Sequence, residues 1–325
     1  MLLEGVRVEA PTGSVQFDVS DSGTLVYLPG GGPAADRALV WVDRSGNATR
    51  VTTEAGRLYH TARLSPDGQR IVTTILAADD NLWMVDFATG THTRLTFEAE
   101  NSRPLWTPDG RSIIFNSTRD GVNNLYRVPA DGPGAVERLT DSPNGQIPTA
   151  VSPDGRSLIF TERKPDGDTD LAVLSLTGKP EVRSLIQTSF QEGDAAISPA
   201  GRHVAYVSNE SGRYEVYVQT LPGLGSKTRV SVDGGDSPIW SRDAREMYFR
   251  NGDKAMAVSV SPGGHFSVSR PRQLFEGAFL QGWEVAPDGR FLMVRLSEEE
   301  TSSRQINVVL NWFDELKQRV PSGAR

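Results

Sequence analysis

Four segments of the chain repeat one phrase: "LSPDGQRIV" (Leu64–Val72), "WTPDGRSIIF" (Trp106–Phe115), "VSPDGRSLIF" (Val151–Phe160) and "VAPDGRFLMV" (Val285–Val294). In every copy Pro-Asp-Gly stands between two apolar stretches. Proline presets φ for the second residue of a turn, aspartate tolerates the third position, and glycine accepts the left-handed conformation that lets two strands pair again. The phrase therefore predicts a hairpin between two strands rather than a catalytic element copied several times.

The turn glycine recurs at a fixed spacing along the chain. It stands at Gly23, Gly68, Gly110, Gly155, Gly201 and Gly289, and Ala244 takes the equivalent place, with separations of 42 to 46 residues. A constant period of this size is typical of solenoids, propellers or arrays. Each period holds four short β-rich runs bounded by Gly, Pro, Asn and Asp, which predicts one four-stranded propeller blade.

Seven turns predict an all-β propeller of seven antiparallel blades, with six blades as the alternative, in a single domain over residues 1–325. The expected blades are residues 14–54, 58–97, 101–141, 146–187, 192–232, 236–276 and 281–312. The last blade is one strand short, so an N-terminal strand at residues 5–10 is expected to close the ring and remove its exposed edges. A short C-terminal helix is expected at residues 313–320.

Composition excludes several classes of protein. The 325 residues include no cysteine, so disulfides, thiolate metal sites and a cysteine nucleophile are excluded. A net charge of −7 and a pI near 5.3 argue against a duplex nucleic-acid partner. No apolar run is long enough to span a membrane, and residues 1–13 lack a signal-peptide pattern, so we expect no membrane contact by this chain. The four histidines do not stand at ligand spacing, and no metal or cofactor is expected.

The repeats resemble a known family. The copies "RLSPDGQRIV" (63–72), "PLWTPDGRSIIF" (104–115) and "ISPAGRHVAYVSNESGRYEVYVQTLP" (197–222) are similar to the WD40-like, Pro-Asp β-propeller family that includes TolB. The resemblance covers nearly the whole chain and implies the propeller fold. TolB-type propellers have six blades, so the seven turns here depart from that member.

A narrower resemblance concerns the order of segments. "FDVSDSGTLVYLPGG" (17–31), "PRQLFEG" (271–277) and "INVVLNWFDELK" (306–317) look like the C-terminal propeller of bacterial transmembrane Ser/Thr protein kinases. The resemblance implies a sensor or interaction module in an extracytoplasmic or periplasmic location. The chain itself carries no His-Arg-Asp loop, no Asp-Phe-Gly and no Gly-x-Ser-x-Gly elbow. We therefore expect a non-enzymatic propeller whose partner is a protein, a peptide or a small polar ligand.

Candidate site residues follow from the position of each inner strand. The residues two places before the repeated turn are mostly apolar, but Glu284, Asp18 and Arg63 are charged and are consecutive in a closed ring of seven. This cluster is either an ion pair that seals the ring or a ligand or cation site. A propeller lactonase, lyase or hydrolase that uses these carboxylates is the alternative function.

A second set of candidates comes from slightly earlier positions, which are expected at the mouth of the channel. These polar or charged residues, with one aromatic nearby, are His60, Arg103, Asp194, Asp236 and Trp283. An aromatic side chain with convergent polar groups suits a polar small molecule or the end of a peptide. A solvated rim without a ligand is the other interpretation.

Overall fold

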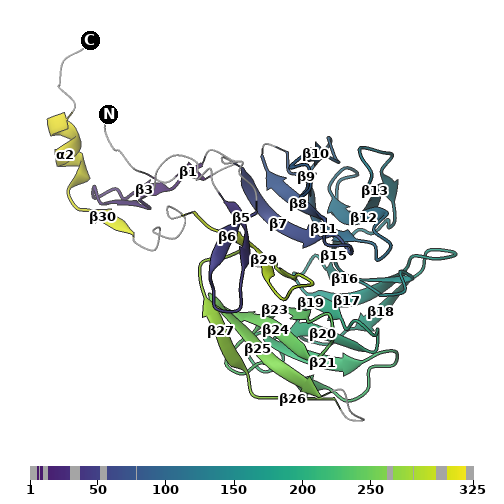
Figure 1. The fold of residues 1–325 in the computed structure, drawn as a ribbon. Coiled ribbons are helices and arrows are strands. Elements are labelled where there is room, and N and C mark those ends of the chain that lie inside the picture. The colour runs from purple at the N-terminus through teal and green to yellow at the C-terminus, as the bar shows by residue number, and fades with distance from the viewer. Residues whose placement is uncertain are drawn as a thin grey trace.

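The structure is a computed structural model that describes residues 6, 8–9, 14–29, 37–51, 57–77, 79–261, 266–280, 282–297 and 306–319. Its main body is a ring of antiparallel sheets around a central axis (Figure 1). A much smaller sheet, with the C-terminal helix beside it, stands at one side of the ring (Figure 1).

Five blades of the ring consist of consecutive strands. Blade 1 contains β7 (Leu58–Leu64), β8 (Arg70–Leu76), β9 (Asn81–Asp86) and β10 (His92–Arg94). Blade 2 contains β11 (Asn101–Trp106), β12 (Ser112–Ser117), β13 (Asn124–Pro129) and β14 (Glu137–Arg138). Blade 3 contains β15 (Gly145–Val151), β16 (Ser157–Arg163), β17 (Thr169–Ser175) and β18 (Val182–Ile186).

The next two blades follow the same order. Blade 4 contains β19 (Glu192–Ile197), β20 (His203–Ser208), β21 (Glu215–Thr220) and β22 (Thr228–Arg229). Blade 5 contains β23 (Asp236–Trp240), β24 (Glu246–Asn251) and β25 (Lys254–Ser261), whose outer edge pairs with both β26 (Ser267–Val268) and β27 (Arg272–Glu276). These five sheets match the expected blades from residue 58 to residue 276.

Blade 6 joins the two ends of the chain. Its inner strands are β28 (Glu284–Val285) and β29 (Phe291–Arg295), and its outer strands are β5 (Ala38–Val42) and β6 (Ala48–Arg50). Met293 of β29 lies opposite Val40 of β5. An N-terminal segment therefore closes the ring as expected, but the segment is residues 38–50 and not the strand expected at 5–10. Within that stretch, β1 (Val8–Glu9) pairs instead with β2 (Ser14–Val15).

The ring has six blades in the described part of the chain, so the prediction of seven is wrong and the alternative count holds. Six buried apolar clusters show this, because each one joins two neighbouring blades and together they complete the circle. In β5, Val40 packs toward blade 5 and Leu39 toward blade 1. A strand that is apolar on both faces needs a blade on each side, and β5 finds this between blades 5 and 1.

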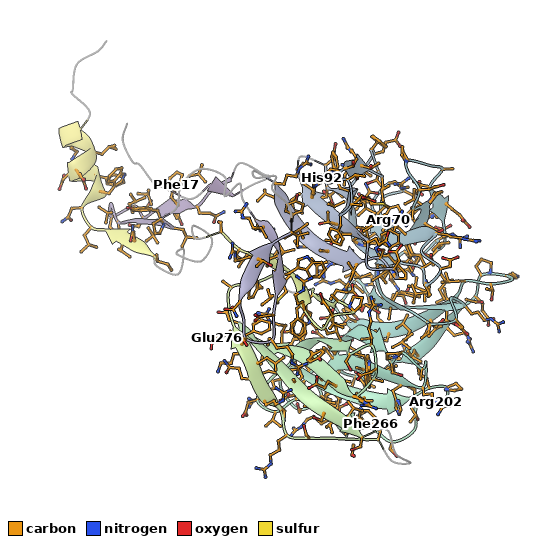
Figure 2. The ribbon with its side chains drawn as sticks, viewed as in Figure 1. Phe17, Arg70, His92, Arg202, Phe266 and Glu276 are labelled. Atoms are coloured by element: carbon orange, nitrogen blue, oxygen red, sulfur yellow. The ribbon has the colours of Figure 1, made fainter. Side chains whose placement is uncertain are left out.

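The seventh turn belongs to the small sheet. It joins β3 (Phe17–Val19) to β4 (Leu25–Tyr27), and β4 also pairs with β30 (Asn307–Val309), which was expected in the last blade. Figure 2 shows Phe17 on this sheet, apart from the side chains that fill the ring. The helix α2 (Trp312–Arg319) matches the one expected at 313–320, although residue 320 lies outside the described residues. Phe313 packs over Gly23, where a Cβ would lie 2.8 Å from its ring.

The repeated phrase forms the predicted turn. In the first ring copy, Gly68 has φ +74° and its N–H donates to Ser65 O at 2.8 Å. Ser65 Oγ donates to Asp67 Oδ1 at 2.5 Å, and that carboxylate oxygen also accepts the Gln69 N–H at 3.0 Å. These bonds hold the pKa of Asp67 below its usual value, the serine hydroxyl contributing most. The aspartate is therefore a turn former.

The turns also join neighbouring blades. A Cβ placed on Gly110 would lie 3.8 Å from Pro66 Cδ, and one on Gly155 would lie 3.9 Å from Pro108 Cδ. Each turn glycine in these pairs rests against the turn proline of the preceding blade. The phrase thus builds one end of the ring and positions the inner strands around the channel.

Candidate functional site

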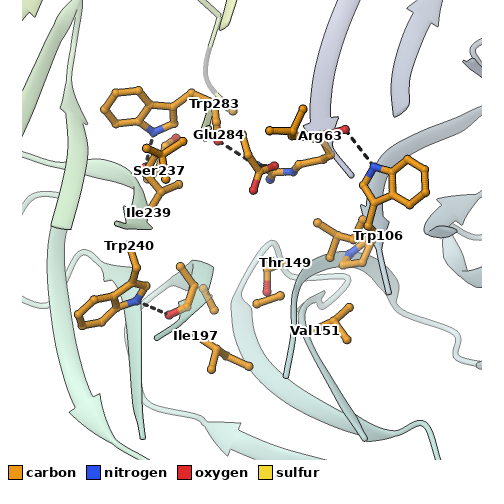
Figure 3. Close-up of a pocket in the computed structure, with 18 of the residues that line it drawn as sticks. Arg63, Trp106, Thr149, Val151, Ile197, Ser237, Ile239, Trp240, Trp283 and Glu284 are labelled. Carbon is orange, nitrogen blue, oxygen red and sulfur yellow. Dashed lines mark hydrogen bonds and ion pairs between the residues drawn. The ribbon is translucent and has the colours of Figure 1, made fainter. Parts of the chain in front are cut away.

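A cavity of about 420 Å³ occupies the central channel (Figure 3). All six inner strands of the ring contribute to its wall: β7, β11, β15, β19, β23 and β28. It extends from Arg103 and Asp194, near the starts of their strands, to turn residues that include Pro66 and Pro108. The wall mixes proline and aliphatic side chains with a few charged groups, which is the composition expected of a ligand pocket.

Bulges in the inner strands direct charged side chains into this cavity. The pairing of β11 with β12 shifts between Ser102 and Leu105, and that of β19 with β20 shifts between Gly193 and Ala196. Arg103 and Asp194 occupy these bulges with φ of 54° and 48°. Non-glycine residues rarely adopt this conformation, and bulges re-aim side chains at sheet edges. Each inner strand is the channel-side edge of its blade, where bulges are common.

Tryptophans join the inner strands of adjacent blades. Trp106 Nε1 donates to the carbonyl oxygen of Arg63 at 3.0 Å, and Trp240 Nε1 donates to that of Ala196 at 3.1 Å (Figure 3). These bonds use backbone acceptors that the open edge of an inner strand would otherwise leave to solvent. They fix the relative positions of the strands that carry the charged residues.

Arg63 and Glu284, which were expected in one cluster with Asp18 between them, are direct neighbours in the channel. Arg63 Nη1 lies 3.8 Å from Glu284 Oε2 and donates a hydrogen bond to Trp283 O at 3.1 Å (Figure 3). The enclosing walls raise the pKa of Glu284, and Arg63 opposes this effect. Because 3.8 Å is beyond hydrogen-bond range, the pair is weak and both groups remain open to the cavity.

Arg103 lines the cavity without a close partner among the described residues. No hydrogen bond or ion pair joins its guanidinium to any residue that the structure describes. Its side chain is exposed to the channel, yet the surrounding ring desolvates it and lowers its pKa. The charge of Asp194 opposes that shift, whereas the charge of Arg63 adds to it. Arg103 therefore lies near the positive charge of Arg63, on the inner strand of blade 1, and near the negative charge of Asp194, on the inner strand of blade 4.

His60 and Asp236 lie near the mouth of the channel opposite the repeated turns, at the starts of β7 and β23. Both are half-buried. Burial, with smaller contributions from Arg103 and Arg37, lowers the pKa of His60 to about 4, so its ring is neutral at pH 7. Burial raises the pKa of Asp236, and the charge of Asp194 adds to the shift. Neither residue lines the cavity, but both lie within electrostatic reach of residues that do.

One predicted site residue lies outside the ring, and another, Trp283, lines the cavity but has a buried side chain. Asp18 lies in β3 of the small sheet, where it is exposed and its Oδ1 accepts the N–H of Val19 at 2.8 Å. The predicted cluster of three charges is thus only the Arg63–Glu284 pair, because blade 6 is followed directly by blade 1. Trp283 is 1% exposed, stacks on Phe291 with ring centroids 5.1 Å apart, and donates from Nε1 to Ser237 O at 2.8 Å. Its role is to position Arg63 through its carbonyl oxygen.

Sequence reasoning missed Arg242, which lines the turn end of the cavity. The signal was present: "WSRDAREMYF" (240–249) places this arginine where other copies of the turn have proline. Because Pro66, Pro108 and Pro199 also line the cavity, the turn position itself faces the channel. An exception to the phrase at that position therefore adds a charge to the site.

Comparisons with known proteins agree with this fold. Residues 36–179 match the family model described as "PD40: TolB beta propeller domain". An uncharacterized protein of Agrobacterium fabrum (strain C58 / ATCC 33970) is 39% identical over 106 residues, which are 31% of this chain and 35% of that protein. The Tol-Pal system protein TolB of Francisella tularensis subsp. tularensis (strain WY96-3418) is 27% identical over 208 residues, 61% of this chain and 47% of that protein. The chain thus spans less than half the length of both relatives.

Solved structures show the same architecture. A TolB candidate from Agrobacterium tumefaciens superposes with a TM-score of 0.66 over 81% of this chain and 99% of that chain, at 18% identity. Oligogalacturonate lyase in complex with manganese has a TM-score of 0.56 over 91% of this chain and 81% of that chain, at 14% identity. At such identities the likeness shows the fold alone. The ring and these matches together support a TolB-like β-propeller.

Two further observations concern the described residues only. Their helix is neither long nor apolar enough to span a membrane. They contain no group of three or more His, Asp or Glu side chains arranged to hold a metal ion.

Proposed function

We propose that this propeller is a non-catalytic interaction module that binds a segment of a partner protein in its central channel. The observation that carries the proposal is the cavity of about 420 Å³, whose wall combines prolines and aliphatic residues with charges that have few partners. An extended peptide offers alternating apolar and polar groups along its length, and such a wall fits both.

A second observation favours a protein over a free small molecule. Exposed apolar side chains gather in the loops at the end of the ring opposite the repeated turns. They are Phe97, Val122, Phe190, Tyr214 and Val232, which are 42% to 55% exposed. Each lies between the second and third strands of a blade or before the next inner strand, so all belong to the end where His60 and Asp236 stand. Exposed apolar groups that gather on one face are typical of protein contact sites.

The enzyme alternative has lost one of its supports. It required two carboxylates, Glu284 and Asp18, to act together, and Asp18 lies in the small sheet outside the ring. The lyase among the structural neighbours shares only the fold. The interaction module is therefore the better proposal.

We further propose that the module is the extracytoplasmic sensor part of a bacterial signalling kinase. Its support is the resemblance in the order of segments 17–31, 271–277 and 306–317. Sequencing the gene from which the chain derives tests this. A kinase domain and one membrane span encoded upstream in the same frame are expected, and an unrelated domain there would overturn the kinase role.

The channel proposal is tested by blocking the cavity. Peptides selected from a random display library on the wild-type protein would be measured by calorimetry against Ile147→Trp, which fills the cavity wall, and Val182→Trp, which adds the same side chain to the exposed outer strand β18. We expect Ile147→Trp to weaken binding by about tenfold or more, equivalent to about 1.4 kcal/mol, and Val182→Trp to leave it unchanged. A library that yields no peptide sensitive to Ile147→Trp would refute the proposal.

A further inference from the structure

Charges of both signs line the channel, and two of the positive ones lie on neighbouring inner strands. Arg63 and Arg103 lie on the inner strands of blades 1 and 2, whereas Asp194 and Asp236 lie on those of blades 4 and 5. In a closed ring of six, blade 1 stands opposite blade 4 and blade 2 opposite blade 5. Arg63 and Arg103 therefore form a cationic wall, which Asp194 faces across the channel, while Glu284 borders this wall and Arg242 lines the turn end of blade 5.

Only one of the two arginines in the cationic wall has a carboxylate at ion-pair distance among the described residues. Arg63 pairs with Glu284, whose Oε2 lies 3.8 Å from its Nη1, whereas Arg103 forms no hydrogen bond with any described residue. The two guanidinium groups also repel each other, since Arg63 is one of the charges that lower the pKa of Arg103. Two like charges held together in a partly desolvated channel are unfavourable unless an anion joins them.

The backbone holds Arg103 in this position. Arg103 lies in a bulge at φ 54°, next to Pro104, while Trp106 of the same strand is bonded to the carbonyl oxygen of Arg63 at 3.0 Å. The conformation is unfavourable for an arginine, and strain of this kind is found at binding sites. The bond between the strands keeps the two arginines side by side rather than letting the blades move apart.

We propose that Arg63 and Arg103 form a carboxylate-binding subsite, which receives the C-terminal carboxylate or an Asp or Glu side chain of the segment bound in the channel. The planar guanidinium presents paired N–H donors that match the two oxygens of a carboxylate. The acidic surface of the protein, with a net charge of −7, repels such a group elsewhere, so the cationic wall selects where it binds. This inference rests on the proposed function, because it names what the channel recognises.

The test uses peptides selected on the wild-type protein and shown to depend on the channel by their loss of binding to Ile147→Trp. Each is synthesised as a free acid, as a C-terminal amide, and with every Asp or Glu changed to Asn or Gln. Affinities are measured for the wild type, Arg63→Gln, Arg103→Gln and the control Arg111→Gln, which changes an arginine of the turn after Asp109 that does not line the cavity. The melting temperature of each variant confirms that it is folded.

We expect Arg103→Gln and Arg63→Gln each to weaken binding of the carboxylate peptides by about tenfold to a hundredfold, the range for hydrogen bonds to charged groups. The neutralised peptide should bind the wild type equally weakly and lose nothing further on either substitution. Loss with the amide form identifies a chain terminus as the source, and loss with the Asn or Gln form identifies a side chain.

Two results separate the inference from the function on which it rests. If Ile147→Trp abolishes binding but both arginine variants bind as the wild type does, the channel site stands and the carboxylate subsite is overturned. If no peptide depends on Ile147, both are overturned. Should Arg111→Gln weaken binding as strongly as Arg103→Gln, the effect comes from net charge and the subsite is also overturned.

Discussion

Gly155 and Ala244 occupy the same place in two copies of the turn, and their exchange should have opposite effects. Gly155 has φ +71° and Ala244 has φ +56°. A Cβ at Gly155 would meet Pro108 at 3.9 Å, an ordinary contact, so space is not limiting. Left-handed backbone costs an L-residue about 1–2 kcal/mol, and the smaller freedom of alanine in the unfolded chain offsets about 0.4–1 kcal/mol. Gly155→Ala should therefore destabilise by about 0.5–1 kcal/mol, and Ala244→Gly should stabilise by a similar amount.

Urea denaturation and calorimetry of both variants measure this, with about 1.5 °C of melting temperature expected per kcal/mol at this chain length. Gly155→Val should cost more, about 2 kcal/mol, because a β-branched side chain is a true outlier at positive φ. Ala77→Gly is the matched control, since Ala77 is exposed and is not in the left-handed region, so glycine should destabilise there. If Ala244→Gly destabilises the fold as Ala77→Gly does, the conclusion that Ala244 is strained at positive φ is wrong.

Other consequences follow for pH and for the contacts between blades. Hydrogen bonds from Arg44 and Tyr248, the Arg44 bond contributing most, lower the pKa of Glu246 from 4.5 to about 2, so its stabilisation is complete above pH 4.5 and is lost as the pH falls toward 2. Glu246→Gln should flatten that part of an acid denaturation curve. Burial raises the pKa of Glu192, so its contribution has the opposite sign: it is present below pH 4.5 and is lost as the pH rises through the folded pKa. Glu192→Gln should leave the melting temperature at pH 4 unchanged and raise it at pH 8. Trp106→Phe, which removes the 3.0 Å bond to a backbone carbonyl, should cost about 1 kcal/mol in urea denaturation.

Much of the fold was predictable because a turn with a strict conformational requirement leaves a strict sequence. The Pro-Asp-Gly copies gave the period, the β class and the bounds of five blades from residue 58 to residue 276. The blade count was not predictable in the same way. Strand pairing at the closure joins β29 to β5, about 250 residues earlier, and no local spacing records such a partner. Both the N-terminal strand expected at 5–10 and the run at 38–42 are apolar enough to be the strand that closes the ring.

The site was predictable where the repeat fixes geometry. Arg63 and Glu284 were expected in one cluster, and they do lie together, because both follow the turn register in blades that meet at the closure. Asp18 obeys the same register but lies outside the ring, so its prediction failed with the blade count. Trp283 lines the cavity as expected, but its ring packs against Phe291 and Tyr248 in the core. Which face of a strand a side chain takes depends on bulges, and a shift of one residue reverses it.

Departures from the repeat mark the site better than the repeat itself does. A ring of identical blades would have an evenly lined channel, with proline at each turn and one residue type at each bulge. This chain instead places Arg242 at a proline position, and the charged residues Arg103 and Asp194 at the positive-φ bulge position where blade 5 has Ser237 and blade 6 has Gly282. Each departure costs stability and adds a charge to the same cavity. Repeats that only stabilise the scaffold need no such exceptions. The exceptions all lie in one cavity, and this is the strongest argument that binding, and not closure of the ring alone, determined the residues of the channel.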